Sequence, residues 1–225
     1  MRGPSRPERS GFAQRISRAV VRIGEIQITP SAGGFELRHR KDQARHDLST
    51  FSVAEDAIAL ALYDDDGKYR RLRTAPNLRR GWLLKLADAA AVEMAIDGFY
   101  PGRLPAYEMW RNERLMPTDL RETLHRQSGM YRIAAKISDP QIEAVVSRTC
   151  QSDGGCLRTI LWRRDRSGAL PAMRLSGEKY DPFHDQTGGG EETVPLLCPE
   201  ACNILIAAAR EAVKATIPRV ADSRR

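Results

Sequence analysis

Apolar and polar residues alternate near the start of the chain in a way that predicts a β-hairpin. The alternation runs through residues 20–28 and returns at 35–38, after a turn-forming segment at 30–34 that contains Pro30 and Gly34. Because successive side chains of a strand point to opposite faces, a period of two is typical of a half-buried sheet. We therefore expect antiparallel strands over residues 20–38, joined by a turn.

Apolar residues at helical spacing predict two helices further along. Residues 54–62 are mostly apolar, and Ser52 with Glu55 matches the capping-box pattern that begins a helix. Leucine and alanine recur every three or four residues between 83 and 95, which favours a second helix that ends at Gly98. A short strand is predicted between them, over residues 68–73.

The segment 101–117 is rich in proline and is the best candidate for a domain junction. The pattern after it combines helical and strand-like stretches, so this half of the chain is also α+β. It predicts three helices: one that begins at residue 118, one over 141–147 and one over 199–215. It also predicts strands over 130–137 and 157–162, and a polar loop over 177–193 with glycines at 188–190.

The composition is that of a folded protein without a membrane span. Of 225 residues 41% are hydrophobic, and no run approaches the roughly 20 apolar residues that a spanning helix needs. The formal net charge is +7, and the first 22 residues hold six arginines but one acidic residue. This composition is typical of a disordered tail, although targeting segments share it. We expect a cytoplasmic protein with disordered tails at 1–19 and 217–225.

The four cysteines carry the clearest chemical signal. They form two close pairs, Cys150 with Cys156 and Cys198 with Cys202, all in the last third of the chain. Four thiolates brought together by folding suit zinc or an iron–sulfur cluster. Since Pro199 fits the first position of a helix, Cys198 is predicted to be its N-cap and Cys202 to lie one turn later. Both sulfurs would then lie at a helix N-terminus, which favours the thiolate anion.

Three other roles for these cysteines stay open. Structural zinc sites usually separate paired ligands by two to four residues, so the wider spacing of Cys150 and Cys156 fits an iron–sulfur cluster better. Unrelated buried cysteines, or two disulfides in an oxidising compartment, are the remaining alternatives. Around a cluster we expect positive charge and a docking face for a partner, contributed by Arg148, Arg158, Arg163, Arg164 and Trp162.

Two sets of motifs resemble a known family. Segments 34–40, 72–82 and 99–101 (GFELRHR, LRTAPNLRRGW and FYP) resemble the stabilising domain of some chelatase-like proteins of sirohydrochlorin and cobalt metabolism. Segments 126–132, 156–162 and 198–203 (RQSGMYR, CLRTILW and CPEACN) resemble the 4Fe-4S cluster-binding domain that follows it. The resemblance covers residues 21–214 and implies these cluster ligands: Cys150, Cys156, Cys198 and Cys202. The second cysteine pair is also similar to thioredoxin-like 2Fe-2S ferredoxins.

Together these observations predict an α+β protein of two parts. Residues 20–116 form a small mixed α/β stabilising domain, and residues 117–216 form an α+β iron–sulfur domain of a thioredoxin-like or ferredoxin-like kind. The expected cofactor is a 4Fe-4S cluster, with 2Fe-2S or zinc as alternatives. The expected role is electron transfer, or a redox or structural function linked to tetrapyrrole metabolism, and whether the chain is an enzyme by itself stays open.

The resemblance does not carry chelatase activity to this chain. Chelatases of that family bind the inserted metal through histidines of an N-terminal βα domain, whereas the histidines here are scattered, at His39, His46, His125 and His184. A separate chelatase or redox protein is therefore the expected partner. The alternatives are a zinc-stabilised module that binds an anionic partner through the arginine-rich segment 70–80, and an accessory subunit that completes a chelatase. Neither nucleic acid nor a membrane is an expected partner.

Overall fold

The chain folds into two compact units that are interleaved in sequence. The computed structural model describes residues 11–116, 118–126, 135–150, 156, 159–163 and 191–216. Unit 1 comprises Met1–Asn112 and Pro182–Leu196, and unit 2 comprises Glu113–Asp181 and Leu197–Arg225. The combination of helices with a mostly antiparallel sheet confirms the α+β class. Among the described residues, no helix is long and apolar enough to cross a membrane.

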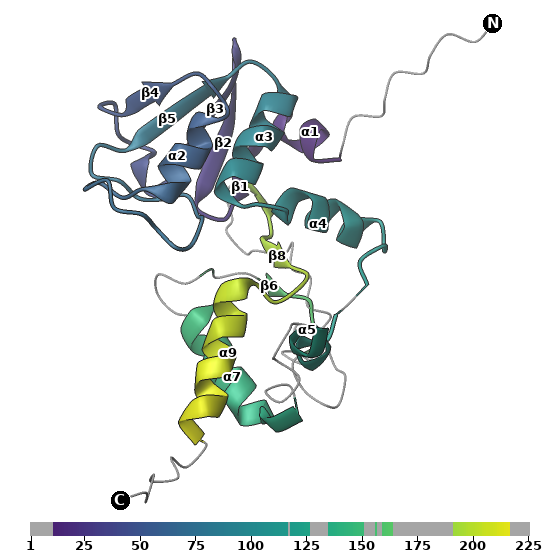
Figure 1. Ribbon diagram of the computed structural model, residues 1–225. Helices are drawn as coiled ribbons and strands as arrows, with labels where there is room; N and C mark the ends of the chain where they lie inside the picture. Colours follow the sequence, from purple (N-terminus) through teal and green to yellow (C-terminus); the bar gives the residue numbers. More distant parts are fainter. Residues whose placement is uncertain are drawn as a thin grey trace, which may run out of the picture. The chain divides into compact units, whose positions relative to one another are not determined.

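Unit 1 is built on a six-stranded mixed sheet (Figure 1). Its spatial order is β4-β5-β3-β2-β1-β7, with a parallel pair at each edge and antiparallel pairs between. The strands are β1 (Val20–Ile23), β2 (Ile26–Ser31), β3 (Gly34–His39), β4 (Ser49–Phe51), β5 (Trp82–Leu86) and β7 (Glu191–Val194).

Helices cover the apolar face of this sheet, on which every second residue of β1, β3, β5 and the first four residues of β2 is buried. α3 packs on β3 and β5, α1 packs on β1 and β2, and α2 packs against α3. The Trp82 ring stacks on Phe99 of α3 with centroids 4.8 Å apart. The helical segments of unit 1 are α1 (Gly11–Ile16), the 3-10 turn η1 (Arg40–Asp42), α2 (Asp56–Leu62), α3 (Ala89–Phe99) and α4 (Arg103–Arg111).

The predicted hairpin is confirmed by β2 and β3, which pair in antiparallel register from Ile26 with His39 to Ser31 with Gly34. The alternating segment 20–28 also contains a turn that we did not predict. Gly24 has a φ of +56°, and a side chain there would meet Tyr100 and Leu196. This left-handed residue lets β1 fold back on β2 without breaking the alternation of buried residues.

The helix predicted over 83–95 is wrong in its first part. Residues up to Leu86 form β5, which lies between β3 and β4, and the helix α3 begins only at Ala89. Neighbouring strands supply hydrogen bonds on both sides of β5, so tertiary pairing overrides the local helical spacing. Gly98 lies within α3, and a Cβ there would come within 3.0 Å of the Ala57 Cβ. That glycine therefore permits close packing of α2 on α3.

Three further predictions for unit 1 need correction. The tail predicted over 1–19 contains α1, because Phe12 and Ile16 are buried against the sheet. Helix α2 has Glu55 as its N-cap with no side-chain hydrogen bond, so Ser52 forms no capping box. The strand predicted over 68–73 is reduced to a single bridge between Tyr63 and Tyr69. Residues 1–10 and 217–225 lie outside the described residues.

In the part of unit 2 that the structure describes, helices and a short parallel sheet pack around one apolar core. Its elements are α5 (Leu120–Arg126), α7 (Asp139–Thr149), β6 (Thr159–Ile160), β8 (Leu197–Cys198) and α9 (Asn203–Thr216). The predicted helix at 141–147 is confirmed as part of α7, and the capping box of Ser138 with Gln141 begins it. The side-chain amide of Gln141 also donates to the Ala212 carbonyl of α9 at 3.3 Å. The two described strands of unit 2 pair only with each other and do not show the larger sheet of a thioredoxin-like fold.

Residues of the predicted loop 177–193 enter the sheet of unit 1. β7 runs parallel to β1, with Val20 opposite Glu191 and Ile23 opposite Val194. The boundary after Asn112 lies close to the predicted junction, but β7 belongs to unit 1 although it falls within 117–216. Three segments lie outside the described residues: the rest of that loop, the glycines at 154–155 and most of the predicted strand 130–137.

Candidate metal centre

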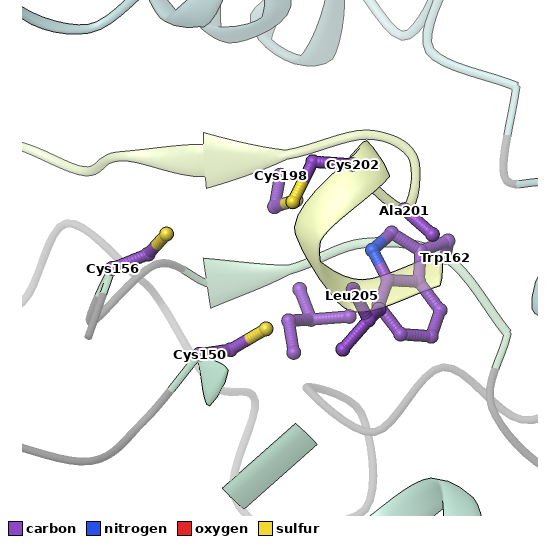
Figure 2. A pocket seen from close by; sticks show the side chains of 8 residues that line it. Cys150, Cys156, Trp162, Cys198, Ala201, Cys202 and Leu205 are labelled. Atoms are coloured by element: carbon purple, nitrogen blue, oxygen red, sulfur yellow. The ribbon is translucent and has the colours of Figure 1, made fainter. Parts of the chain in front are cut away.

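The four cysteines come from four separate places in unit 2 and line one cavity (Figure 2). Cys150 is the C-cap of α7, Cys198 ends β8, and Cys202 directly precedes α9. Cys156 precedes β6. The cavity measures about 290 Å³ including its open mouth, and apolar side chains complete its wall: Ile160, Trp162, Ala201 and Leu205.

The parallel pairing of β6 with β8 brings two sides of this cavity together. Ile160 lies opposite Cys198 in the register, and the Leu161 amide donates to the Cys198 carbonyl at 3.0 Å. The Thr118 hydroxyl donates to the Pro199 carbonyl at 3.1 Å and so ties the loop after β8 to the start of α5. Backbone hydrogen bonds therefore position the second cysteine pair.

The predicted helix N-cap at Cys198 is wrong. α9 begins at Asn203, and the first helical hydrogen bond runs from the Ile206 amide to the Cys202 carbonyl at 3.0 Å. Because the Cys198 backbone is used in strand pairing, residues 199–202 form a loop rather than the first turn of a helix. Cys202 alone lies at the helix N-terminus, where unpaired amides favour an anion.

No disulfide joins the four cysteines, all of which are described, and they differ in exposure. Cys150 and Cys198 are buried within the apolar core of unit 2, whereas Cys156 and Cys202 are partly exposed. The Cys198 thiol donates to the Glu200 carbonyl at 3.1 Å. Figure 2 shows the sulfurs of Cys150 and Cys156 directed toward the side on which Cys198 and Cys202 lie.

The arrangement of the thiols fits a cluster better than a single ion. A tetrahedral zinc site holds four sulfurs at about 2.3 Å from the metal, and therefore roughly 3.8 Å from each other. Among the described residues, which include every cysteine, no group of three or more His, Cys, Asp or Glu side chains is arranged to hold a single metal ion. Four thiols around a shared cavity instead match the larger body of an iron–sulfur cluster.

Of the arginines expected near the cluster, the two that the structure describes, Arg148 and Arg163, are not part of the cavity wall. Arg148 is exposed on α7, and Arg163 uses its backbone to pair with Asp119 and to donate to the Thr118 carbonyl. Arg158 and Arg164 lie outside the described residues. The described cavity wall therefore consists of thiols and apolar side chains, without a charged group.

Trp162 lies in the cavity wall and not on a docking face. The side chain is fully buried, which contradicts the predicted surface role. Its indole Nε1 is shielded from solvent and has no hydrogen-bond partner among the described residues. Burial of a donor without an acceptor costs about 1–3 kcal/mol of folding free energy. An acceptor inside the cavity would remove this cost. Sequence reasoning missed this role, since tryptophan alone does not indicate which way its N–H points.

Two arginines of the segment 70–80 make hydrogen bonds or ion pairs within unit 1. The Arg70 guanidinium donates to the carbonyls of Ala61 and Thr74, each at 3.0 Å, and burial lowers its pKa. Arg79 forms ion pairs with Asp65 and Asp66. These contacts give two of the arginines a structural role, which weakens the alternative of an anion-binding surface.

The geometry of unit 2 thus defines a protein with a cysteine-lined cavity for a metal cluster. Comparison with protein families agrees. Residues 112–211 match the model of a 4Fe-4S iron–sulfur cluster binding domain, and residues 8–114 match the model of the DR2241 stabilising domain. The predicted combination of a stabilising domain with a 4Fe-4S domain is therefore confirmed, and the chain has an iron–sulfur binding role with a 4Fe-4S cluster as cofactor.

A solved structure supports the same combination. The chain resembles DR2241 from Deinococcus radiodurans with a TM-score of 0.66 and 29% sequence identity, over 90% of this chain. That protein is described as multi-domain, with structural similarity to chelatases and two additional novel domains. The present chain spans about 40% of its length. No curated protein matches the chain.

Proposed function

We propose that Cys150, Cys156, Cys198 and Cys202 ligate the 4Fe-4S cluster and that the chain uses it to transfer single electrons. The observation that carries this proposal is the cavity in which thiols from four separate segments meet apolar walls. When bound, such a cluster supplies reversible one-electron chemistry. Because four thiolates occupy the four irons, this ligand set leaves no iron open to substrate, which favours electron transfer over Lewis-acid catalysis.

The surrounding residues suit such a role. Ile160, Ala201 and Leu205 exclude water from the inner wall of the cavity, which limits the loss of metal and tunes the potential. Cys156 and Cys202 are partly exposed, so they give an electron partner its closest approach to the ligand shell. The buried pair, Cys150 and Cys198, anchors the site in the core.

Replacement of single cysteines tests the ligand assignment. The protein is purified without oxygen, and its iron, acid-labile sulfide and zinc are measured together with the visible spectrum. We expect about four irons and four sulfides per chain, and loss of the 4Fe-4S spectrum in each variant Cys150→Ser, Cys156→Ser, Cys198→Ser and Cys202→Ser. Ile142→Val, which alters the same core of unit 2 without touching a sulfur or the cavity wall, serves as the matched control. Stoichiometric zinc without sulfide, or a cluster unchanged in the serine variants, would refute the assignment.

Electron transfer needs a separate measurement. We expect dithionite to reduce the loaded protein by one electron, giving a paramagnetic signal that disappears on reoxidation with the visible spectrum restored. A cluster that binds but is destroyed by one such cycle would contradict electron transfer and leave a structural role.

We further propose that the electrons serve tetrapyrrole metabolism. The support is the likeness of the solved relative to chelatases and the stabilising domain that this chain shares with it. The test is co-purification of the loaded chain with a sirohydrochlorin or cobalt chelatase of the same organism, followed by electron transfer between them. Failure of the pair to associate would remove this link without affecting cluster binding.

A further inference from the structure

We propose that the indole N–H of Trp162 donates a hydrogen bond to a sulfur of the bound cluster and thereby raises its reduction potential. This inference rests on the proposed function, since it requires a cluster within the four-cysteine cavity. Its physical basis is the buried Nε1, which has no hydrogen-bond partner in the described part of the chain and belongs to a side chain that lines the cavity.

The other fully buried tryptophan has a hydrogen-bond partner for its indole N–H. Trp82 in unit 1 is as deeply buried as Trp162, but its Nε1 donates to the Pro76 carbonyl at 2.8 Å. Buried N–H groups are almost always paired, because removal from water without a new acceptor costs free energy. Of the two fully buried indoles, Trp162 is therefore the one whose N–H has no acceptor among the described residues, and it lies in the wall of the cysteine cavity.

The composition of the cavity wall identifies the acceptor. Beside Trp162 the lining side chains are three aliphatic ones, from Ile160, Ala201 and Leu205, and four thiols. Aliphatic groups accept no hydrogen bond, so sulfur is the acceptor that the lining side chains offer. A cluster adds sulfide and thiolate sulfurs, which carry negative charge and accept better than a neutral thiol.

A hydrogen bond to a cluster sulfur has a definite effect on the potential. Reduction adds one negative charge to the cluster, so a donor stabilises the reduced state more than the oxidised state. The cavity wall described here holds no charged group that would provide the same stabilisation. Loss of the Trp162 N–H is therefore expected to make reduction harder.

Trp162→Phe tests this directly, since phenylalanine keeps an apolar ring and removes the donor. We expect the variant to bind the 4Fe-4S cluster with a more negative midpoint potential, by an amount on the order of a tenfold change in the equilibrium constant for reduction, which is 59 mV for one electron. Ile142→Val is the matched control, because it changes the packing of the same core of unit 2 but neither the cavity wall nor a donor. We expect its potential to stay close to that of the unmodified protein.

A second measurement covers the case in which Trp162→Phe fails to load. Pulsed electron paramagnetic resonance on the reduced, unmodified protein, labelled with ¹⁵N in its indole rings, is expected to show a nitrogen coupled to the cluster. Trp82, the other fully buried tryptophan, is not expected to give this coupling, because its indole N–H donates to the Pro76 carbonyl. Absence of the coupling, or equal potentials for the unmodified protein and Trp162→Phe, would overturn the role of Trp162. Absence of any 4Fe-4S cluster in the unmodified protein would instead overturn the proposed function.

Discussion

At the scale of single residues, unit 1 contains a buried histidine whose protonation is linked to its fold. His39 at the end of β3 is 3% exposed, and its Nδ1 accepts a hydrogen bond from the Lys41 amide at 3.2 Å. Its Nε2 lies 3.5 Å from a Glu25 carboxylate oxygen. Burial lowers the pKa of His39, and it outweighs the opposing attraction of Glu25 and Asp42 for the charged form.

Unit 1 is therefore expected to lose stability in mild acid. Because the folded pKa of His39 is below the unfolded value of about 6.5, the unfolded chain takes up a proton that the folded chain does not. The contribution is fully present above about pH 6.5 and is lost as the pH falls toward the folded pKa. Urea unfolding, followed by the fluorescence of Trp82 after Trp110 and Trp162 have been replaced by phenylalanine, should show this dependence weakened in His39→Gln.

The exposed His46 provides the control for that measurement. His46→Gln should keep the pH dependence of the unmodified protein. A dependence that is equally strong in His39→Gln would mean that other groups of unit 1 cause it.

At the scale of elements, strands and helices with one strong local signal could be predicted, and elements that depend on distant partners could not. The pair β2 and β3 is local, so alternation and a turn sufficed to predict it. β5 and β7 are strands because β3 and β1 lie beside them, and a window of sequence does not contain that information.

The metal centre follows the same division. The pairing and chemistry of the four cysteines are visible in their types and spacing, so the sequence sufficed to select residues that line one cavity. The local structure at Cys198 was mispredicted because proline permits a helix start without requiring one, and the pairing of β8 with β6 decides the outcome. The orientation of the Trp162 indole depends on packing, which spacing does not encode.

The N-terminal cap of α7 offers a test at this scale. The Ser138 hydroxyl accepts from the Gln141 amide, and the Gln141 side chain accepts from the Ser138 amide at 2.9 Å. Ser138→Ala removes one half of this capping box, and we expect unit 2 to lose about 1 kcal/mol of unfolding free energy. Urea unfolding measured by circular dichroism, with the cluster removed, reports the change.

Ser147 lies exposed on the same helix and supplies the matched control. Ser147→Ala should leave stability unchanged or slightly higher, because alanine favours helices more than serine does. Equal losses for both serine variants would indicate that the cap contributes nothing.

At the scale of the whole molecule, the two units differ in what stabilises them. The sheet of unit 1 carries buried aliphatic and aromatic side chains along four of its strands. In the core of unit 2, Cys150 and Cys198 lie among apolar residues beside a cavity. A cofactor bound in that cavity adds its binding free energy to unit 2.

Removal of the cluster should therefore affect the units unequally. We expect hydrogen exchange to become faster in β6, β8 and the first turn of α9, which position Cys198 and Cys202, and to stay nearly constant in β2 and β3. Hydrogen-exchange mass spectrometry of the loaded and cluster-free protein measures this difference peptide by peptide. Equal acceleration in both units would mean that cluster binding supports the entire chain.

The strand β7 has a consequence for how the protein is made. A ribosome completes β1, β2, β3, β4 and β5 before it reaches Glu191–Val194, so the nascent unit 1 presents β1 as an open edge while residues from Glu113 onward emerge. An unpaired strand edge can join another chain. Cys150 and Cys156 are also synthesised before this edge closes, and Cys198 and Cys202 follow only a few residues after it. The order of translation thus completes the sheet just before the last thiols of the metal centre appear.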